Sequence, residues 1–303
     1  MRIVYIIISH KNHEQTLRLF NRLNKDGVSF VFHISTTCDS GYFEEVHSAL
    51  KDHPNVYFAK RAFVRWGDAG DVHAALNAID TISQEKLDYD YAFLLSGQCY
   101  PIKSHEVICQ TIEKYKGRQL VEYFPFSEKR DEYFDRIVKR HFWIGNLHFW
   151  YPHHGGQKKL LTGLLNLLIF PFVPKRQPAP PGYLFFKGSF WWTLTKDCVE
   201  YLYQYAHSEN GRNLMMFLKN TYHAGETYFQ TVLMNSEYKD SIINKDLRYI
   251  LWDDEIDDAG HPNILTINNF DEMASSECLF GRKFDMQIDP NILDMIDENL
   301  LSS

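Results

Sequence analysis

The first 125 residues alternate between short, continuously apolar runs and segments in which apolar residues recur at helical spacing. Continuous apolar runs cover residues 3–8, 28–34, 56–59, 91–96 and 120–124. Such runs are typical of strands that are buried on both faces of a sheet. Helical spacing lies between them, at residues 17–23, 43–50, 72–82 and 107–112. This alternation predicts an α/β fold whose mostly parallel central sheet is covered by helices on both faces.

The pattern loosens after residue 126 and returns near residue 190. Residues 141–186 are aromatic, rich in proline and irregular. Beyond them we expect strands at residues 190–194 and 247–251, and helices that begin near residues 196, 225 and 290. No linker and no internal repeat divides the chain, so we interpret residues 1–303 as a single domain with two halves, 1–125 and 126–303.

A strongly apolar stretch at residues 160–173 has basic residues on both sides, which extends the segment to 158–176. A segment of this kind can dock on a membrane surface, and it can equally be buried within the domain. The sequence leaves both alternatives open. No stretch reaches the roughly 20 apolar residues that a membrane-spanning helix needs.

Composition narrows the class of protein. The formal charge of -7 argues against a nucleic-acid-binding surface. The five cysteines are scattered and form no CxxC pair, so neither a disulfide framework nor a structural zinc site is indicated. Since no signal-peptide pattern is present either, we expect a cytoplasmic protein, with peripheral contact to the inner face of the membrane if residues 158–176 dock there.

Ligands of open parallel sheets bind at the carboxyl ends of the strands, so the loops that follow the predicted strands are candidate sites. These loops contain Ser9, His10, Trp66, Ser96, Gly97 and Cys99. Each loop is also ordinary turn sequence, so none of them identifies a ligand by itself.

Glu226 is the strongest single candidate for catalytic chemistry. Apolar residues at helical spacing from 228 to 233 predict a helix that begins near Gly225, which places Glu226 in its first turn. A single carboxylate there, beside Tyr222 and His223, fits a general base. The alternative is a first-turn glutamate that only stabilises the helix dipole.

Several enzyme classes lack their motifs here. The sequence holds no P-loop, no GxGxxG after the first strand, no HExxH and no GxSxG. Asp88 and Asp90 form the DxD pattern that holds a metal in many nucleotide-sugar transferases, but they precede a predicted strand instead of following it. We interpret this pair and the acidic loop at residues 253–258 as solvated, and we expect no metal site at the histidines of 141–154.

Six short motifs together resemble glycosyltransferase family 14, which contains core-2/I-branching N-acetylglucosaminyltransferases and peptide O-xylosyltransferases. Residues 93–103 (FLLSGQCYPIK) resemble the family's LSGxDYPI, and residues 187–195 (KGSFWWTLT) resemble GSQWWSLT. The others are Trp66 with the helix after it, ETYFQT at 226–231, LRYI at 247–250 and FGRKFD at 280–285. They occur in the family's order, and the short N-terminus is similar to that of bacterial members.

The resemblance implies a GT-A-like, Rossmann-type nucleotide-sugar-binding fold, with the donor held by the first half and the acceptor and catalytic groups by the second. It implies an inverting transfer from a UDP-sugar without a divalent metal or another cofactor. The family's catalytic base matches Glu226, and its diphosphate-binding residues match Arg248 and Lys283. A leaving UDP develops negative charge that a cation must stabilise, and arginine and lysine can do this in place of a metal.

The same resemblance assigns roles to the remaining candidates. The strand-end loops become donor contacts, through Ser9, His10, Trp66, Ser96, Gly97 and Cys99. Glu122 aligns with an acidic acceptor-binding position, and Trp191 or Trp192 can stack on a sugar ring. Because neighbouring strand residues face opposite sides, we expect one of these two tryptophans to be a core residue.

Three positions depart from the family's pattern. Cys99 and Ser35 stand where the family usually has aspartate, near the donor sugar and the uracil, and Gly225 replaces an acid before the base. The identity of the donor sugar therefore stays open, as do the acceptor, the linkage and the oligomeric state.

The hypothesis is an inverting, metal-independent transfer of N-acetylglucosamine from a UDP-sugar to a hydroxyl of a glycan or a lipid-linked oligosaccharide, in surface polysaccharide synthesis. One alternative is a metal-dependent transferase that uses Asp88 and Asp90 or the acidic loop. Another is a protein that binds glycans or nucleotide sugars without catalysis.

Overall fold

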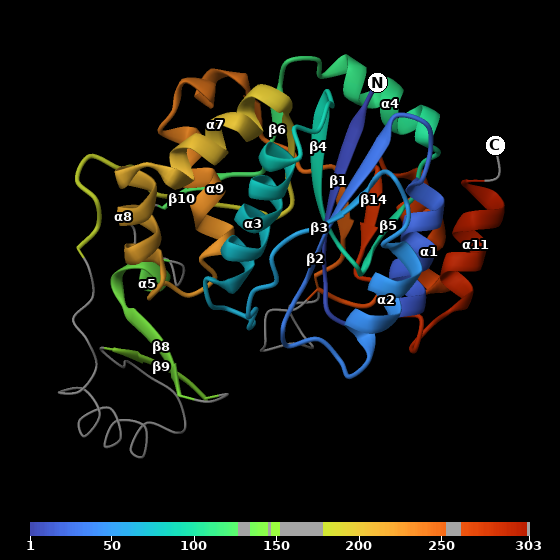
Figure 1. Cartoon of the computed structure of the whole chain (residues 1–303), viewed down its shortest axis with the longest axis horizontal. Helices are drawn as coiled ribbons and strands as arrows, with labels where there is room; N and C mark the ends of the chain where they lie inside the picture. Colours follow the sequence, from blue (N-terminus) through green and yellow to red (C-terminus); the bar gives the residue numbers. More distant parts are fainter. Residues whose placement is uncertain (127–133, 145–146, 152–177, 253–261, 302–303) are drawn as a thin grey trace.

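The computed structural model describes residues 1–126, 134–144, 147–151, 178–252 and 262–301, which form an α/β fold around a large central sheet (Figure 1). The sheet contains β1 (Ile3–Ser9), β2 (Val28–Ile34), β3 (Val56–Phe58), β4 (Tyr91–Ser96), β6 (Gln119–Leu120), β11 (Thr193–Thr195) and β12 (Ile242–Ile243). Their order is β12-β6-β11-β4-β1-β2-β3, and only β11 runs antiparallel to its neighbours. The predicted α/β class with a mostly parallel central sheet is confirmed.

Alternate residues of β1 pack into two cores, one on each face of the sheet. Ile3, Tyr5 and Ile7 belong to the first core, whereas Val4 and Ile6 belong to the second. The first core is covered by α1 (His13–Leu23), α2 (Tyr42–Leu50), α4 (His105–Lys114), α10 (Phe270–Ser275) and α11 (Asn291–Asn299). The second is covered by α3 (Gly70–Gln84), α7 (Lys196–His207), α8 (Glu209–Leu218) and α9 (Gly225–Met234) (Figure 1). Burial on both faces explains the unbroken apolar runs.

A smaller sheet packs against the first core. In it, β14 (Phe280–Arg282) pairs in parallel with β13 (Arg248–Ile250) and antiparallel with β5 (Cys99–Pro101). Tyr100 and Phe280 are fully buried and anchor this sheet to the core. Because β5 follows closely on β4, the pairing of Arg282 with Cys99 brings Arg282 to the carboxyl end of β4.

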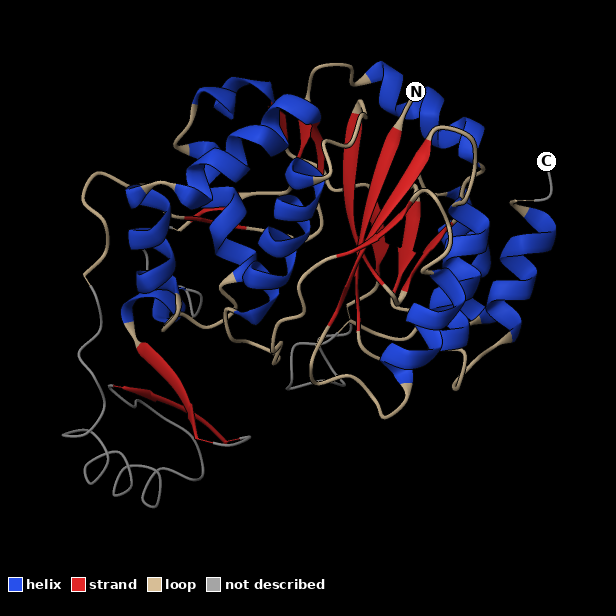
Figure 2. Cartoon of the chain, viewed as in Figure 1, coloured by secondary structure: helices blue, strands red, loops and turns tan. Residues whose placement is uncertain are grey.

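The remaining described elements lie outside these two sheets. β7 (Phe124–Pro125) pairs with β10 (Phe186–Lys187). α5 (Phe134–Val138) leads into a hairpin of β8 (Arg140–Ile144) and β9 (Leu147–Tyr151), which projects from the body of the molecule (Figure 2). Two short 3-10 helices span Glu237–Ser241 and Ile267–Asn269.

The structure corrects the element predictions in the second half. The predicted strand at 120–124 is two separate strands, β6 and β7, and only the end of 190–194 is in a strand. The hairpin of β8 and β9 lies within the region expected to be irregular. Residues 160–173 and 253–258 lie outside the described residues. No helix in the described part of the chain is long and apolar enough to cross a membrane.

Candidate active site

Glu226 lies in the first turn of α9, as the sequence predicts, and its carboxylate is half-buried. Arg136 of α5 donates from Nη1 to Oε2 of Glu226 at 2.6 Å. Nδ1 of His223 lies 3.8 Å from the other carboxylate oxygen. The sequence pattern does not single out Arg136, because 90 residues separate it from its partner.

Burial raises the pKa of Glu226 above its ordinary value, and the positive charges of Arg136 and Lys187 oppose this rise. The position at a helix N-terminus would by itself favour the ionised form. Desolvation is the larger effect here. A carboxylate whose pKa is raised towards the working pH is better matched to accept a proton from a hydroxyl group.

An exposed aromatic residue lies on the Glu226 side of the site. The Trp66 ring is 44% exposed and packs edge-on against Tyr222 and His223, with centroid distances of 5.5 and 4.7 Å. The amide of His223 donates to the carbonyl of Gly67 at 2.9 Å, which joins this loop to the start of α9. The structure therefore places Trp66 beside the candidate base, although the sequence analysis assigns it to the donor.

Glu122 belongs to the same group of side chains. Its Oε2 accepts from the amide of Ser189 at 3.0 Å, and the amide of Gly188 donates to the carbonyl of Glu226 at 2.9 Å. Burial, followed by the charges of Asp246 and Glu226, raises the pKa of Glu122. The predicted acceptor-binding carboxyl and the predicted base thus share one site.

The two neighbouring tryptophans differ in position. Trp192 is fully buried in the second core, against Phe229 at a centroid distance of 5.7 Å, so its ring is not accessible to a sugar. Trp191 is half-buried, and the guanidinium carbon of Arg282 lies 4.3 Å from its ring centroid. Of the two predicted stacking residues, Trp191 alone remains a candidate for acceptor contact.

The carboxyl ends of β1 and β4 meet as the parallel sheet predicts. The amide of Gly97 donates to the carbonyl of Ile8 at 3.0 Å, and a Cβ on Gly97 would lie 2.9 Å from Cβ of Ser9. The side chain of Ser96 accepts a hydrogen bond from Arg282. Ser9, Ser96 and Gly97 therefore lie together at one edge of the sheet.

Basic residues gather at this edge. The pKa of His10 is lowered, first by desolvation and then by the positive charges of Lys11, Lys283 and Arg282, against which Asp39 acts. Burial also lowers the pKa of Arg282. Among the described residues, no carboxylate pairs with the Arg282 guanidinium. A partly buried cation of this kind favours an anionic ligand.

Arg282 is a residue that the sequence reasoning missed. It lies within the FGRKFD motif and directly precedes Lys283, so the motif already contained the signal. Its position beside Ser96 follows from the pairing of β14 with β5, which no periodicity in the sequence predicts.

Arg248 occupies a different environment from the one expected of a diphosphate ligand. Its side chain is buried, donates to the carbonyls of Asp246 at 2.6 Å and Leu94 at 3.3 Å, and lies over the rings of Phe93 and Phe280. Burial lowers its pKa. These contacts bind Arg248 to the core beneath the strand ends.

Cys99 is fully buried in β5, and its Sγ accepts from the amide of Ser96 at 3.4 Å. Arg282 also lies within hydrogen-bonding reach of this thiol. Where an aspartate would neutralise the guanidinium, the thiol leaves the positive charge in place. Ser35 is buried directly after the end of β2, and its hydroxyl lies 2.7 Å from the hydroxyl of Thr37.

The DxD residues lie at the opposite edge of the sheet. Asp88 pairs with Arg2 and Lys196, and Asp90 accepts from the amide of Arg2 at 2.7 Å, just before β4 begins. These contacts agree with the interpretation of a solvated lead-in. Among the described residues, no three histidine, cysteine or acidic side chains form a group that could hold a metal ion; the acidic loop lies outside them.

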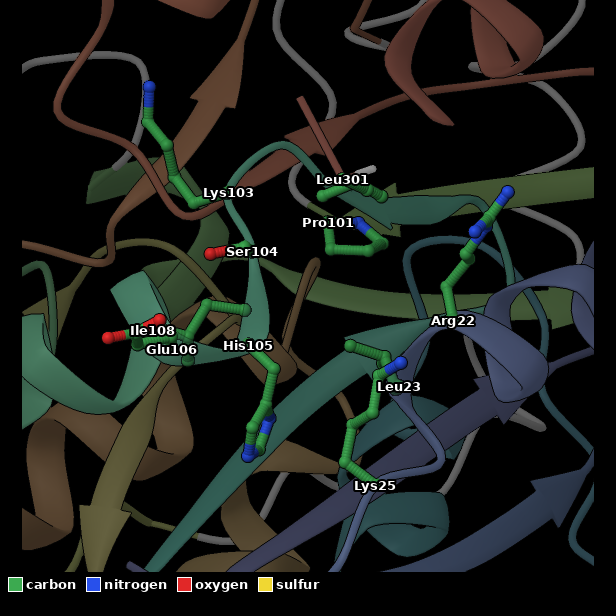
Figure 3. Close-up of a pocket in the computed structure, with 10 residues that line it drawn as sticks. All are labelled: Arg22, Leu23, Lys25, Pro101, Lys103, Ser104, His105, Glu106, Ile108 and Leu301. Atoms are coloured by element: carbon green, nitrogen blue, oxygen red, sulfur yellow. The ribbon is translucent and has the colours of Figure 1, made fainter. Parts of the chain in front are cut away.

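A pocket of about 250 Å³ lies away from these residues, where α1 ends and α4 begins (Figure 3). Arg22, Pro101, His105 and Leu301 are among its lining residues. It contains none of the predicted site residues, so it does not bear on their chemistry.

The amino-acid sequence is similar to a known protein family and to several characterised proteins. Residues 3–274 match the sequence model of a family described as Core-2/I-Branching enzyme. Beta-glucuronosyltransferase GlcAT14A of Arabidopsis thaliana is 26% identical over 318 residues, which cover 99% of this chain and 64% of that protein. Xylosyltransferase 2 of Rattus norvegicus is 24% identical over all of this chain and 34% of its own length.

A further relative is the N-acetyllactosaminide beta-1,6-N-acetylglucosaminyl-transferase of Homo sapiens, at 21% identity over 97% of this chain and 71% of that protein. The chain thus spans less than two thirds of the length of the plant relative and about a third of that of the rat relative. Among solved structures, one that aligns with this chain is galactosyltransferase LgtC in complex with donor and acceptor sugar analogs. The alignment covers 99% of this chain and 96% of LgtC, with 7% sequence identity and a TM-score of 0.42.

Proposed function

The chain belongs to the Core-2/I-branching enzyme family, and we propose that it is an inverting, metal-independent glycosyltransferase that moves a sugar from a UDP-sugar to a hydroxyl of a glycan. The observation that carries this proposal is the short segment of residues 188–191, which contacts both ends of the site. Gly188 bonds to the backbone of Glu226, and Trp191 packs on Arg282. Four residues span at most about 14 Å, so this segment keeps the start of α9 and the Arg282 guanidinium in one region of the molecule.

The base acts on the acceptor. Glu226 takes the proton of the attacking hydroxyl as its oxygen forms the new bond to the anomeric carbon of the donor sugar. The bond from that carbon to the UDP oxygen breaks, and the electron pair leaves with UDP. Attack from the face opposite the leaving group inverts the anomeric centre, through an oxocarbenium-like state.

The basic edge acts on the leaving group. Negative charge grows on the β-phosphate as UDP departs, and fixed cations at that place lower the barrier. Arg282 and Lys283 at the end of β14 are the residues for this role, with His10 beside them. The absence of a carboxylate partner for Arg282 among the described residues supports its assignment to the diphosphate.

The donor sugar proposed here is N-acetylglucosamine. The related proteins carry the names of glucuronosyl-, xylosyl- and N-acetylglucosaminyl-transferases, so family membership leaves more than one donor available. Cys99, at the position next to Arg282, is the residue most directly placed to affect that choice. For the acceptor we propose a surface glycan or lipid-linked oligosaccharide of a bacterium, with the protein in the cytoplasm and residues 158–176 in contact with the membrane.

The test is UDP release from a panel of UDP-sugars in EDTA, with and without a broad panel of acceptor glycans. We expect acceptor-dependent release in EDTA, with the fastest donor identifying the transferred sugar. Release only after Mn²⁺ is added would contradict the metal-independent mechanism and favour the acidic residues. Donor binding without release across the whole panel would favour a binding protein.

A further inference from the structure

Gly225, directly before Glu226, lacks a side chain for reasons of space. Its backbone is not in the left-handed region that favours glycine. A Cβ built there would lie 2.3 Å from Oδ2 of Asp71 and 2.9 Å from the ring of Phe190. The glycine therefore leaves room for the Asp71 carboxyl against the start of α9, next to the candidate base.

Asp71 lies in the first turn of α3, which packs beside α9 on the second core (Figure 1). Its Oδ1 accepts a hydrogen bond from the amide of Val72 at 2.8 Å. No described residue donates a hydrogen bond to its Oδ2. The nearby charges are Asp68 on the same segment and Glu226 on α9, which is itself paired with Arg136. This oxygen is not among the polar atoms that are closed off from solvent in the described part of the chain, so a hydroxyl group of a ligand can reach it.

The protonation state of Asp71 suits contact with a hydroxyl group. Burial, followed by the negative charges of Asp68 and Glu226, raises the pKa of Asp71 to about 8. Below that pH the carboxyl keeps its proton, so it can donate one hydrogen bond and accept others. A sugar hydroxyl also donates and accepts, which makes the two groups complementary.

We propose that Asp71 is a second acceptor-binding residue, which holds one hydroxyl of the acceptor sugar while Glu226 takes the proton of a neighbouring hydroxyl. This inference rests on the proposed function and extends it to the class of acceptor. Two carboxyl groups at the start of α9 select a sugar that presents two hydroxyls near each other, over the single hydroxyl of a serine side chain.

Two other roles for Asp71 make different predictions. A residue that only tunes Glu226 would shift the pH dependence of the reaction and leave the Michaelis constant for the acceptor unchanged. A residue that only packs α3 against α9 would change the unfolding temperature and affect donor and acceptor kinetics together. Contact with the acceptor changes the acceptor constant selectively.

The experiment measures steady-state kinetics with UDP-N-acetylglucosamine and three kinds of acceptor: methyl β-D-galactopyranoside and methyl β-D-glucopyranoside, their single-deoxy analogues, and a serine-containing peptide. We expect Asp71→Ala to raise the KM of the best sugar acceptor about tenfold or more, with an unchanged donor KM. With the wild type, one deoxy analogue should show a KM raised by as much. With Asp71→Ala, the same analogue should show no further rise in KM, because the substitution and the deoxy change remove the same contact.

Exchange of the carboxyl between the two helices provides a second readout. Gly225→Asp alone should disrupt the site, because its Cβ would occupy the space of Asp71. The double variant Asp71→Ala/Gly225→Asp restores a carboxyl there from α9, although the new Cβ still lies 2.9 Å from the Phe190 ring, and we expect it to bind the acceptor more tightly than Asp71→Ala alone. Asp71→Asn, which still donates and accepts hydrogen bonds, should lose less than Asp71→Ala.

The two possible failures are distinguishable. If the wild type transfers sugar and Asp71→Ala keeps the wild-type acceptor KM for every sugar, this inference is wrong while the proposed function stands. If the wild type prefers the serine peptide to every sugar, the inference is also wrong. If the wild type transfers from no UDP-sugar to any acceptor, the proposed function itself fails, and the inference with it.

Discussion

Two arginines lie in the two motifs that the resemblance assigns to diphosphate binding, LRYI and FGRKFD. Their surroundings in the structure differ. Arg248 is buried, bonded to two backbone carbonyls and packed on Phe93 and Phe280. Arg282 is half-buried, bonded to Ser96 and packed on Trp191. The first environment is that of a structural residue, and the second is the one that the proposed diphosphate contact requires.

This difference gives a paired prediction. Arg282→Gln should weaken UDP binding about 10- to 100-fold, since a charged hydrogen bond contributes about 1.5–3 kcal/mol, and leave the unfolding free energy almost unchanged. Arg248→Ala should lower the unfolding free energy by about 3 kcal/mol, because it leaves a cavity and two unpaired carbonyls. Calorimetric UDP titration and urea unfolding measure the two effects. Exposed Arg118 provides the control variant, Arg118→Gln. Weaker UDP binding in Arg248→Ala without a loss of stability, together with a loss of stability in Arg282→Gln, would contradict this account.

The environment of Glu226 predicts the pH dependence of transfer. Burial raises its pKa while Arg136 lowers it, and the base acts only when ionised. The rate kcat/KM should therefore fall as the pH decreases through a value above the ordinary pKa of glutamate. Arg136→Gln removes the opposing charge, so the pKa rises further and the acid limb should move to higher pH. An acid limb that stays in place or moves to lower pH in this variant would show that Arg136 does not act on the base.

At the scale of elements, regular periodicity identifies the supports of the site but not how they come together. The strands at 28–34 and 91–96 and the helix that carries Glu226 follow from apolar spacing, because burial on both faces or on one stripe imposes that spacing. The pairing of β14 with β5, the reach of Arg136 and the Asp71 carboxyl behind Gly225 depend on contacts between distant segments. The spacing of apolar residues within one segment does not predict such contacts.

The segment of residues 188–191 is the element that links both sides of the site, and Gly188 makes its approach possible. A Cβ on Gly188 would lie 2.0 Å from the carbonyl oxygen of Glu122. Gly188→Ala should therefore displace this segment from Glu226 and lower kcat/KM at least about tenfold in the folded protein, since small misplacements are costly for catalysis.

Gly211, at the start of α8, provides a matched control for that variant. Its Cβ would lie equally close, 2.0 Å, to the carbonyl oxygen of Tyr205. Gly211→Ala should cause a similar loss of stability in circular-dichroism melts, but the fraction that remains folded should keep its activity. Equal losses of specific activity in both variants would mean that Gly188 has only a general structural role.

At the scale of the whole molecule, the seven-stranded sheet unites both halves of the chain. β1 to β4 come from the first half, whereas β11 and β12 come from the second. The sheet edge proposed to hold the donor and the helix that carries Glu226 are therefore packed on the same central sheet. The α/β class could be predicted from the sequence, because continuous burial marks each central strand; the smaller sheet could not, because its strands are short and come from distant segments.

The carboxyls of the site also predict how global stability depends on pH. The pKa of Asp71 is about 8 in the folded protein, against an ordinary value of 3.8. Between these values the folded state holds a proton that the unfolded state has lost, so Asp71 makes unfolding easier as the pH rises. In urea unfolding from pH 5 to 8, the wild type should lose stability relative to Asp71→Asn. A constant difference between the two proteins would contradict this pKa.

The central claim, that Glu226 is the base of a sugar transfer, is tested most directly by the single-turnover rate of wild type and Glu226→Gln at saturating UDP-sugar and acceptor in EDTA. Exposed Glu237 provides the control variant, Glu237→Gln. We predict a rate that is about 10²- to 10⁴-fold lower in Glu226→Gln, with an unchanged dissociation constant for the donor and a normal rate in the control. Equal transfer rates in wild type and Glu226→Gln would contradict the account.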